Sequence, residues 1–296
     1  MHYNVRHTTI YSYADAVSLC QNEVHLTPRQ TPFQSCAGFQ LDIAPDPVRR
    51  RSRIDAFGNQ VWYFSLEEPH HELQITARSR VSIAPRELPI AGATQPWEQV
   101  RDQLIRAESP DMRQLAQFRF ESPFVQLLDE VRDYALVSFT PKRPLLEAAL
   151  DLMSRIFREF KYAPTTTSIS TPTREVMKLR RGVCQDFAHL QICALRCLGL
   201  AARYVSGYLV TAPPPGKPKL IGADASHAWL SVYCPGDGWI DLDPTNNVIP
   251  QQRHVTIGWG RDYSDVCPIQ GVLTGGGSQI LTVSVDVAQI LVDQPA

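Results

Sequence analysis

Apolar and polar residues alternate along much of the first 85 positions of the chain. This period of two is typical of strands that bury one face of a sheet. The segment DAFGNQ, residues 55–60, places Gly58 and Asn59 in a turn between two such strands. We therefore expect residues 1–95 to form an antiparallel β domain. The residues that share a strand face are Tyr3, Val5, Thr9, Tyr11 and Tyr13, then Phe39, Leu41 and Ile43, then Leu73, Ile75, Ala77, Val81 and Ile83.

The pattern becomes helical further along the chain. Residues 122–136, SPFVQLLDEVRDYAL, begin with Ser122, which suits a helix cap, and Pro123, which suits the first helical position. Residues 144–160, PLLEAALDLMSRIFREF, carry a wide apolar stripe and predict a second helix. A third helix of about four turns is expected to begin near Cys184 and to stop at Gly199.

Strand patterns return after these helices, in AARYVSGYL, HAWLSVYC, GWIDLD and finally QILTVSVDVAQI. The proline-rich TAPPPGKPK between the first two is expected to be a loop. Helices followed by strands indicate an α+β fold, with helices packed on an antiparallel sheet. We expect residues 96–296 to contain a helical segment, this core and the C-terminal strand.

Composition narrows the function classes. The 296 residues carry a formal net charge of -1, which gives no basic excess for nucleic acid or a membrane surface. A peptide or protein partner fits better, and the oligomeric state stays open. Seven cysteines form an odd set without a disulfide framework, and the first residues lack the apolar core of a signal peptide. We therefore expect a cytoplasmic protein with reduced cysteines.

The position of Cys184 singles it out among the cysteines. It falls in the first turn of the predicted helix, where unpaired N–H groups and the helix dipole favour a thiolate. Cys193 and Cys197 lie about 180° and 220° around the helix from Cys184. They are expected to be core residues; they could supply two zinc ligands, but no second pair is evident. His189 points about 140° away from Cys184, so we do not expect it to be the partner of the thiol. Because the three cysteines point in different directions, we also do not expect them to bind one metal ion together.

A nucleophilic thiol needs a base from elsewhere in the chain. His227 opens the strand HAWLSVYC, and the next strand ends with two carboxylates, Asp241 and Asp243, on one face. If the two strands are antiparallel, Asp243 lies beside His227 and Asp241 lies one residue pair farther along. The set Cys184, His227 and Asp243 therefore predicts a thiol nucleophile, its base and an orienting carboxylate. A lone cysteine or strand histidine is more often structural, and the combination favours catalysis.

The runs RRGVCQDFAHL and SHAWLSVYCPGDGWIDLDPTN resemble the transglutaminase-like superfamily, in the bacterial branch described as transglutaminase-like enzymes or cysteine proteases. The segments YNVRHTTIYSY, DAFGN and GWGRDYSDVCPIQGV resemble the N-terminal and C-terminal regions of the same branch. The resemblance implies a papain-like core, with Cys184 as nucleophile, His227 as base and Asp243 as orienting residue, and without a cofactor. It does not imply a substrate. No calcium loop of the D-x-[DN]-x-[DN]-G type is present.

These residues predict a hydrolase of peptide or isopeptide amides that works through an acyl-enzyme. The alternatives are transglutaminase-type transfer to amines and a catalytically silent peptide-binding module. The N–H of Cys184 is the expected first oxyanion donor. Tyr162 is a candidate for the second donor, although a packed tyrosine is the simpler interpretation. The segment Arg261, Asp262 and Tyr263 either lines the cleft and contacts substrate charge or forms a structural ion pair between domains.

Overall fold

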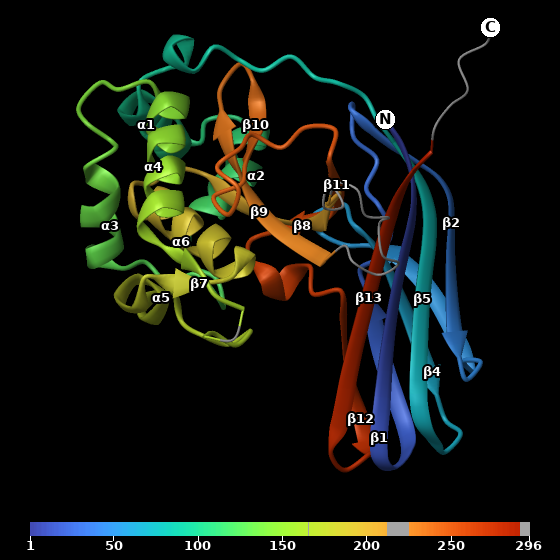
Figure 1. The fold of residues 1–296 in the computed structure, drawn as a ribbon. Helices are drawn as coiled ribbons and strands as arrows, with labels where there is room; N and C mark the ends of the chain where they lie inside the picture. Colours follow the sequence, from blue (N-terminus) through green and yellow to red (C-terminus); the bar gives the residue numbers. More distant parts are fainter. Residues whose placement is uncertain (165, 212–224, 291–296) are drawn as a thin grey trace, which may run out of the picture.

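The computed structural model describes residues 1–164, 166–211 and 225–290, and it confirms the α+β fold. A large antiparallel sheet stands beside a smaller antiparallel sheet, and the helices cover the far side of the smaller one (Figure 1). Among the described residues, no helix combines the length and the hydropathy that crossing a bilayer requires.

The large sheet has the strand order β2-β5-β1-β4-β3, with two further strands on β1. The predicted alternation is confirmed, because Tyr3, Val5, Leu41, Ile75 and Val81 are all buried. Gly58 adopts a φ of +79° in the predicted turn, a conformation that glycine tolerates best. The strands are β1 His2–Val24, β2 Gln34–Ala44, β3 Arg49–Ile54, β4 Gln60–Leu66 and β5 His70–Ile83.

Strand β1 organises this sheet because four other strands pair with it. β4 and β5 follow one edge of β1, whereas β12 Ile269–Gly275 and β13 Gln279–Ile290 follow the other (Figure 1). The last strands of the chain therefore complete the sheet of its first strands. From the sequence we assigned these last strands to residues 96–296. A domain boundary at residue 95 stays a prediction.

The smaller sheet has the order β10-β9-β8-β11, and all its pairs are antiparallel. Its strands are β8 Ala202–Leu209, β9 Ala225–Cys234, β10 Gly238–Leu242 and β11 His254–Gly260. The helices are α1 Trp97–Arg106, α2 Pro110–Ala116, α3 Asp129–Leu136, α4 Leu145–Glu159, α5 Thr173–Leu179 and α6 Cys184–Cys197. Short elements join them, namely η1 Ala91–Ala93, η2 Gln117–Arg119, η3 Tyr263–Asp265, β6 Lys161–Tyr162 and β7 Arg181–Gly182.

Helix α6 is the central element of the core and is buried from Asp186 to Arg196. It packs against β8 and β9 on one side and against other helices on the other (Figure 1). The buried Arg196 donates to the carbonyls of Ala202, Phe120 and Arg261, which satisfies its charged group. Gly199, at a φ of +77°, ends the helix as predicted.

The helix expected from Ser122 begins later, at Asp129. Ser122 and Val125 exchange two backbone hydrogen bonds in a turn, at 2.9 and 3.0 Å. The N–H of Phe124 donates instead to the carboxylate of Asp262, and that of Leu127 to Glu121. The carboxylates of Asp262 and Glu121 thus accept the backbone N–H groups of this segment. The prediction of a helix cap at Ser122 was therefore wrong.

Gly207 of β8 offers a test of how closely the small sheet is packed. A Cβ atom here would overlap the carbonyl oxygen of Val255 and the indole of Trp229. We expect Gly207→Ala to lower the free energy of unfolding by about 1–3 kcal/mol, because the rigid backbone cannot yield. Urea unfolding would measure the loss. Gly92→Ala is the control, since the nearest atom there lies at 3.8 Å, and equal losses in the two variants would contradict the packing argument.

Candidate active site

Cys184 is the first residue of α6, and its half-buried side chain lines a cavity of about 290 Å³. The carboxylate of Asp186 fixes the start of this helix. It accepts the N–H of Val183 at 2.8 Å and the hydroxyl of Thr167 at 2.7 Å. A side chain at Gly182 would collide with Asp186, so the backbone can approach the carboxylate only because this residue is glycine. The thiol is thereby held at the helix N-terminus that the sequence predicted.

His227 of β9 lies between Cys184 and Asp243. Its Nε2 atom is 2.8 Å from Oδ2 of Asp243, and its ring lines the same cavity as Cys184. Burial lowers the pKa of His227, but the hydrogen bond with Asp243 and the proximity of Cys184 raise it to about 10. The arrangement therefore favours the imidazolium form.

Asp243 is completely buried directly after β10. Its Oδ1 accepts the N–H groups of Thr245 and Asn246, and its Oδ2 faces His227, His254 and the Asn246 amide at 2.8 to 3.0 Å. Burial raises the pKa of this carboxyl, but the hydrogen bonds hold it well below its ordinary value. The carboxylate is therefore charged and fully hydrogen-bonded.

The structure brings Asp243, and not Asp241, to His227. Asp241 pairs with Ser231 in the β9–β10 register and accepts its hydroxyl hydrogen bond. It also lies beside a second cavity, whose residues are different from those around Cys184. The two carboxylates therefore have separate surroundings, as expected from the order of the strands.

His254 and Asn246 complete the site, and the sequence analysis missed both. Asn246 lies three residues after Asp243 in the same turn, and this spacing could have indicated a local hydrogen bond. His254 comes from β11, and its Nε2 lies 3.0 Å from Oδ2 of Asp243. No sequence pattern indicates that β11 pairs with β8, so the position of His254 beside Asp243 could not be predicted.

One set of described residues could in principle hold a metal ion, namely His227, Asp243 and His254, whose ligand atoms lie within 4.8 Å of one another. Both imidazole Nε2 atoms instead contact the same carboxylate oxygen at hydrogen-bond distance. A metal would have to displace those protons and draw His227 away from the thiol. Cys193 and Cys197, 3.9 Å apart, make hydrogen bonds to backbone carbonyls of the segment before α3. Absence of a metal stays a prediction.

The large sheet forms one wall of the cavity at Cys184. Its residues Tyr11 on β1 and Leu281 and Val283 on β13 face Tyr204 and Tyr263 of the core. A further cavity, of about 280 Å³, also borders His227 and has a more polar lining that includes Thr245 and Asn246. The cleft therefore extends beyond the histidine in a second direction.

The remaining sequence candidates have other surroundings. His189 is buried, stacks on Phe124 and accepts the N–H of Tyr263, away from Cys184 as expected. Tyr162 is 51% exposed and borders the further cavity beside His227, so the interpretation as a packed tyrosine was wrong.

The segment 261–263 lines the cleft, whereas its ion pair is local and does not join two domains. Arg261 forms an ion pair with Asp265 at 2.8 Å, and Tyr263 lines the cleft. Asp262 caps η3 and is fully buried. Most of the proline-rich loop lies outside the described residues.

Comparisons with known proteins agree with this architecture. Residues 3–82 match the bacterial transglutaminase-like N-terminal region, and residues 135–244 match the transglutaminase-like superfamily. An uncharacterized protein of Mycobacterium tuberculosis is 44% identical over 293 residues, covering 96% of this chain and 92% of the relative. The protein-glutamine gamma-glutamyltransferase of Pseudomonas aeruginosa is 28% identical over 109 residues, covering 34% of this chain and 16% of that protein.

A solved structure shares the whole fold. The crystal structure of "a Putative Cysteine Protease" from Cytophaga hutchinsonii matches with a TM-score of 0.76 at 20% identity, covering 100% of this chain and 92% of that chain. An N-terminal antiparallel sheet is thus joined to a transglutaminase-like core of helices on a second sheet. The chain belongs to the transglutaminase-like superfamily, which confirms the resemblance seen in its sequence.

Replacing Asp243 by Asn tests the electrostatic role of this carboxylate. We expect Asp243→Asn to lower the pKa of His227 from about 10 toward or below its ordinary 6.5, because the neutral amide no longer stabilises the imidazolium. Titration of the histidine ring nitrogens by NMR would measure the change. Asp241→Asn should leave that pKa unchanged, and equal shifts in two folded variants would contradict the assignment.

Proposed function

We propose that the protein is a thiol-dependent hydrolase of peptide or isopeptide amide bonds. One observation carries the proposal: Cys184, at a helix N-terminus, lines the same cavity as His227, and the buried Asp243 holds His227 by a hydrogen bond of 2.8 Å. A nucleophile, a base and an orienting carboxylate in this order are the arrangement that acyl transfer requires. Membership of the transglutaminase-like superfamily supports the same chemistry.

In this proposal Cys184 and His227 react as a thiolate and an imidazolium. The sulfur attacks the amide carbonyl carbon, and the C–N bond breaks as His227 gives its proton to the leaving amine. Water then attacks the thioester, with His227 as the base that takes its proton. The acid is released, and the proton on His227 restores the starting pair. Asp243 keeps the imidazole oriented throughout and stays ionised.

The developing oxyanion needs donors near the thiol. The backbone N–H of Cys184 is available because the first N–H groups of a helix have no acceptor within it. Tyr162 is the second candidate, since it is half exposed at the neighbouring cavity and the charge of Cys184 contributes to the rise of its pKa, after burial. A hydroxyl there would donate to the oxyanion.

The shape of the cleft supports an extended peptide as substrate. Tyr11, Ile169 and Leu281 give one cavity at His227 an apolar lining, whereas Thr245 and Asn246 give the other polar groups. A chain bound across the thiol would place its acyl and amine parts in different surroundings. We propose a cytoplasmic location on the basis of the seven free cysteines, because thiols stay reduced there.

Transfer of the acyl group to an amine is the second candidate, favoured by the similarity to the Pseudomonas aeruginosa gamma-glutamyltransferase. A silent peptide-binding module is disfavoured because a binder does not need a thiol, a histidine and a buried carboxylate together at one cavity. The two enzymatic hypotheses share the acyl-enzyme and differ only in the acceptor that resolves it.

Cys184 is expected to be the most reactive thiol of the chain. Limiting iodoacetamide at about pH 6 should modify it first, because His227 stabilises its thiolate. Peptide mapping by mass spectrometry gives the order of modification, and His227→Asn should slow the reaction of Cys184 alone. Cys197 is an internal control, since a hydrogen bond from Cys193 lowers its pKa without a neighbouring histidine. Earlier labelling of Cys197 would contradict the proposed nucleophile.

We expect hydrolysis to exceed transfer to amines. The cavity beside His227 that carries the polar groups of Thr245 and Asn246 gives water access, whereas a transferase must exclude water from the acyl-enzyme. A peptide library would first identify a substrate that wild type cleaves and Cys184→Ser does not. Addition of a lysine ester at millimolar concentration would then partition the acyl-enzyme, and mass spectrometry would count acid against amide. A product that is mostly amide would favour transglutaminase-type transfer.

A further inference from the structure

A cavity of about 350 Å³ lies on the face of the small sheet opposite to Cys184. Successive side chains of a strand point to opposite faces of a sheet. On β8, Arg203 and Val205 line this cavity, whereas Tyr204 and Ser206 line the cleft at the thiol. Residues 31–34 and 83–86 of the N-terminal part close it from the other side. The proposed hydrolase does not use this space.

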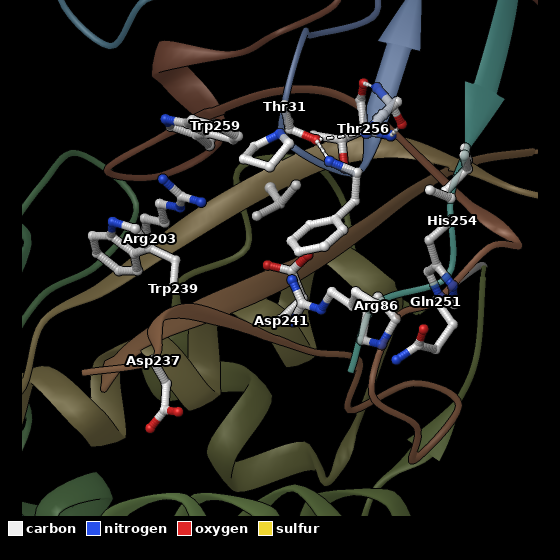
Figure 2. Close-up of a pocket in the computed structure, with 17 residues that line it drawn as sticks. Thr31, Arg86, Arg203, Asp237, Trp239, Asp241, Gln251, His254, Thr256 and Trp259 are labelled. Carbon is white, nitrogen blue, oxygen red and sulfur yellow. Dashed lines mark hydrogen bonds between the residues drawn. The ribbon is translucent and has the colours of Figure 1, made fainter. Parts of the chain in front are cut away.

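Arg203 is buried at one side of the cavity, with 8% of its surface exposed (Figure 2). Its guanidinium lies between the rings of Trp239 and Trp259, at 4.4 and 3.7 Å from their centroids. Nε donates to the Ser231 hydroxyl at 3.3 Å, and the two terminal nitrogens have no acceptor among the described residues. Burial lowers the pKa of Arg203 to about 9, so it is still a cation near neutral pH.

Arg86 brings a second unpaired guanidinium to the same cavity. Its Nη2 atom is buried and has no hydrogen-bond partner among the residues that the structure describes. The opposing carboxylates are Asp241, which already accepts the Ser231 hydroxyl, and Asp237, which is exposed. The lining therefore holds two arginines and two carboxylates, of which Asp241 is occupied by Ser231 and Asp237 faces solvent.

We propose that this cavity binds a small organic carboxylate. A guanidinium presents paired donors that match a carboxylate, and the two carboxylates already in the lining repel a doubly charged phosphate ester more strongly than a monoanion. The rings of Phe33, Trp239 and Trp259 provide apolar walls for the body of the ligand. A volume of about 350 Å³ is large enough for a ligand of benzoate size.

His254 joins the far side of the cavity to the proposed catalytic site (Figure 2). Its Nε2 contacts Asp243, while its buried Nδ1 has no partner among the described residues. A protonated ligand group could reach that nitrogen, but the carboxylate site rests on the two arginines alone. The binding proposal therefore stands or fails independently of the proposed hydrolase.

Calorimetric titration of the full chain with benzoate, benzamide and phenyl phosphate tests the proposal. We expect benzoate to bind at least about tenfold more tightly than the neutral benzamide, because the charged hydrogen bonds are lost with the amide. Benzoate should also bind more tightly than phenyl phosphate. Arg86→Met and Arg203→Lys should each weaken benzoate binding by about tenfold, since the fork of donors is lost.

Arg158→Met is the matched control, since this arginine is exposed on α4 and distant from the cavity lining. It should leave benzoate affinity unchanged. Thermal unfolding of each variant identifies losses that come from misfolding, and Arg86→Met gives a second test if Arg203→Lys does not fold. Equal affinity for benzoate and benzamide, no benzoate binding at millimolar concentration, or unchanged affinity in folded Arg86→Met would overturn the proposal. Tighter binding of phenyl phosphate would overturn the assignment to carboxylates.

Discussion

The buried carboxylate of Asp243 is the constraint on which the site depends. A carboxylate without solvent costs several kcal/mol unless donors replace its water. Here the donors come from β9, from β11 and from the turn after β10, as His227, His254, Thr245 and Asn246. Three segments of the small sheet therefore make hydrogen bonds to one carboxylate. The hydrogen bond with Asp243 fixes the orientation of the His227 ring relative to the thiol.

The same group ties stability to pH in a defined direction. Asp243 has a lowered pKa, so its contribution is present above the unfolded value of about 3.9 and is lost as pH falls through the folded value. His227 has a raised pKa, so its contribution is complete below about 6.5 and is lost as pH rises toward about 10. Both contributions are complete together only between about pH 4 and pH 6.5.

Local patterns in the sequence were sufficient for most elements and for the contacts of Cys184, His227 and Asp243. Alternation identifies strands, and a helix start identifies the half-buried thiol of Cys184, because both signals are local. The false helix start at Ser122 arose where Asp262, distant in sequence, takes a backbone donor. His254 was missed for the same reason, since only the pairing of β11 with β8 brings it to Asp243. Long-range pairing is the information that these patterns lack.

Trp229 explains how two histidines can share one carboxylate inside the protein. Its fully buried indole lies 5.2 Å from the ring of His254 and 6.0 Å from that of His227, between centroids. The absence of a side chain at Gly207 leaves room for this indole, and Gly207 is itself the β8 partner of His227. Both imidazoles and Asp243 are buried beside this indole, so their hydrogen bonds act in a lower dielectric than that of water and are stronger for it. The packing of one apolar residue thus supports the polar network that orients the base.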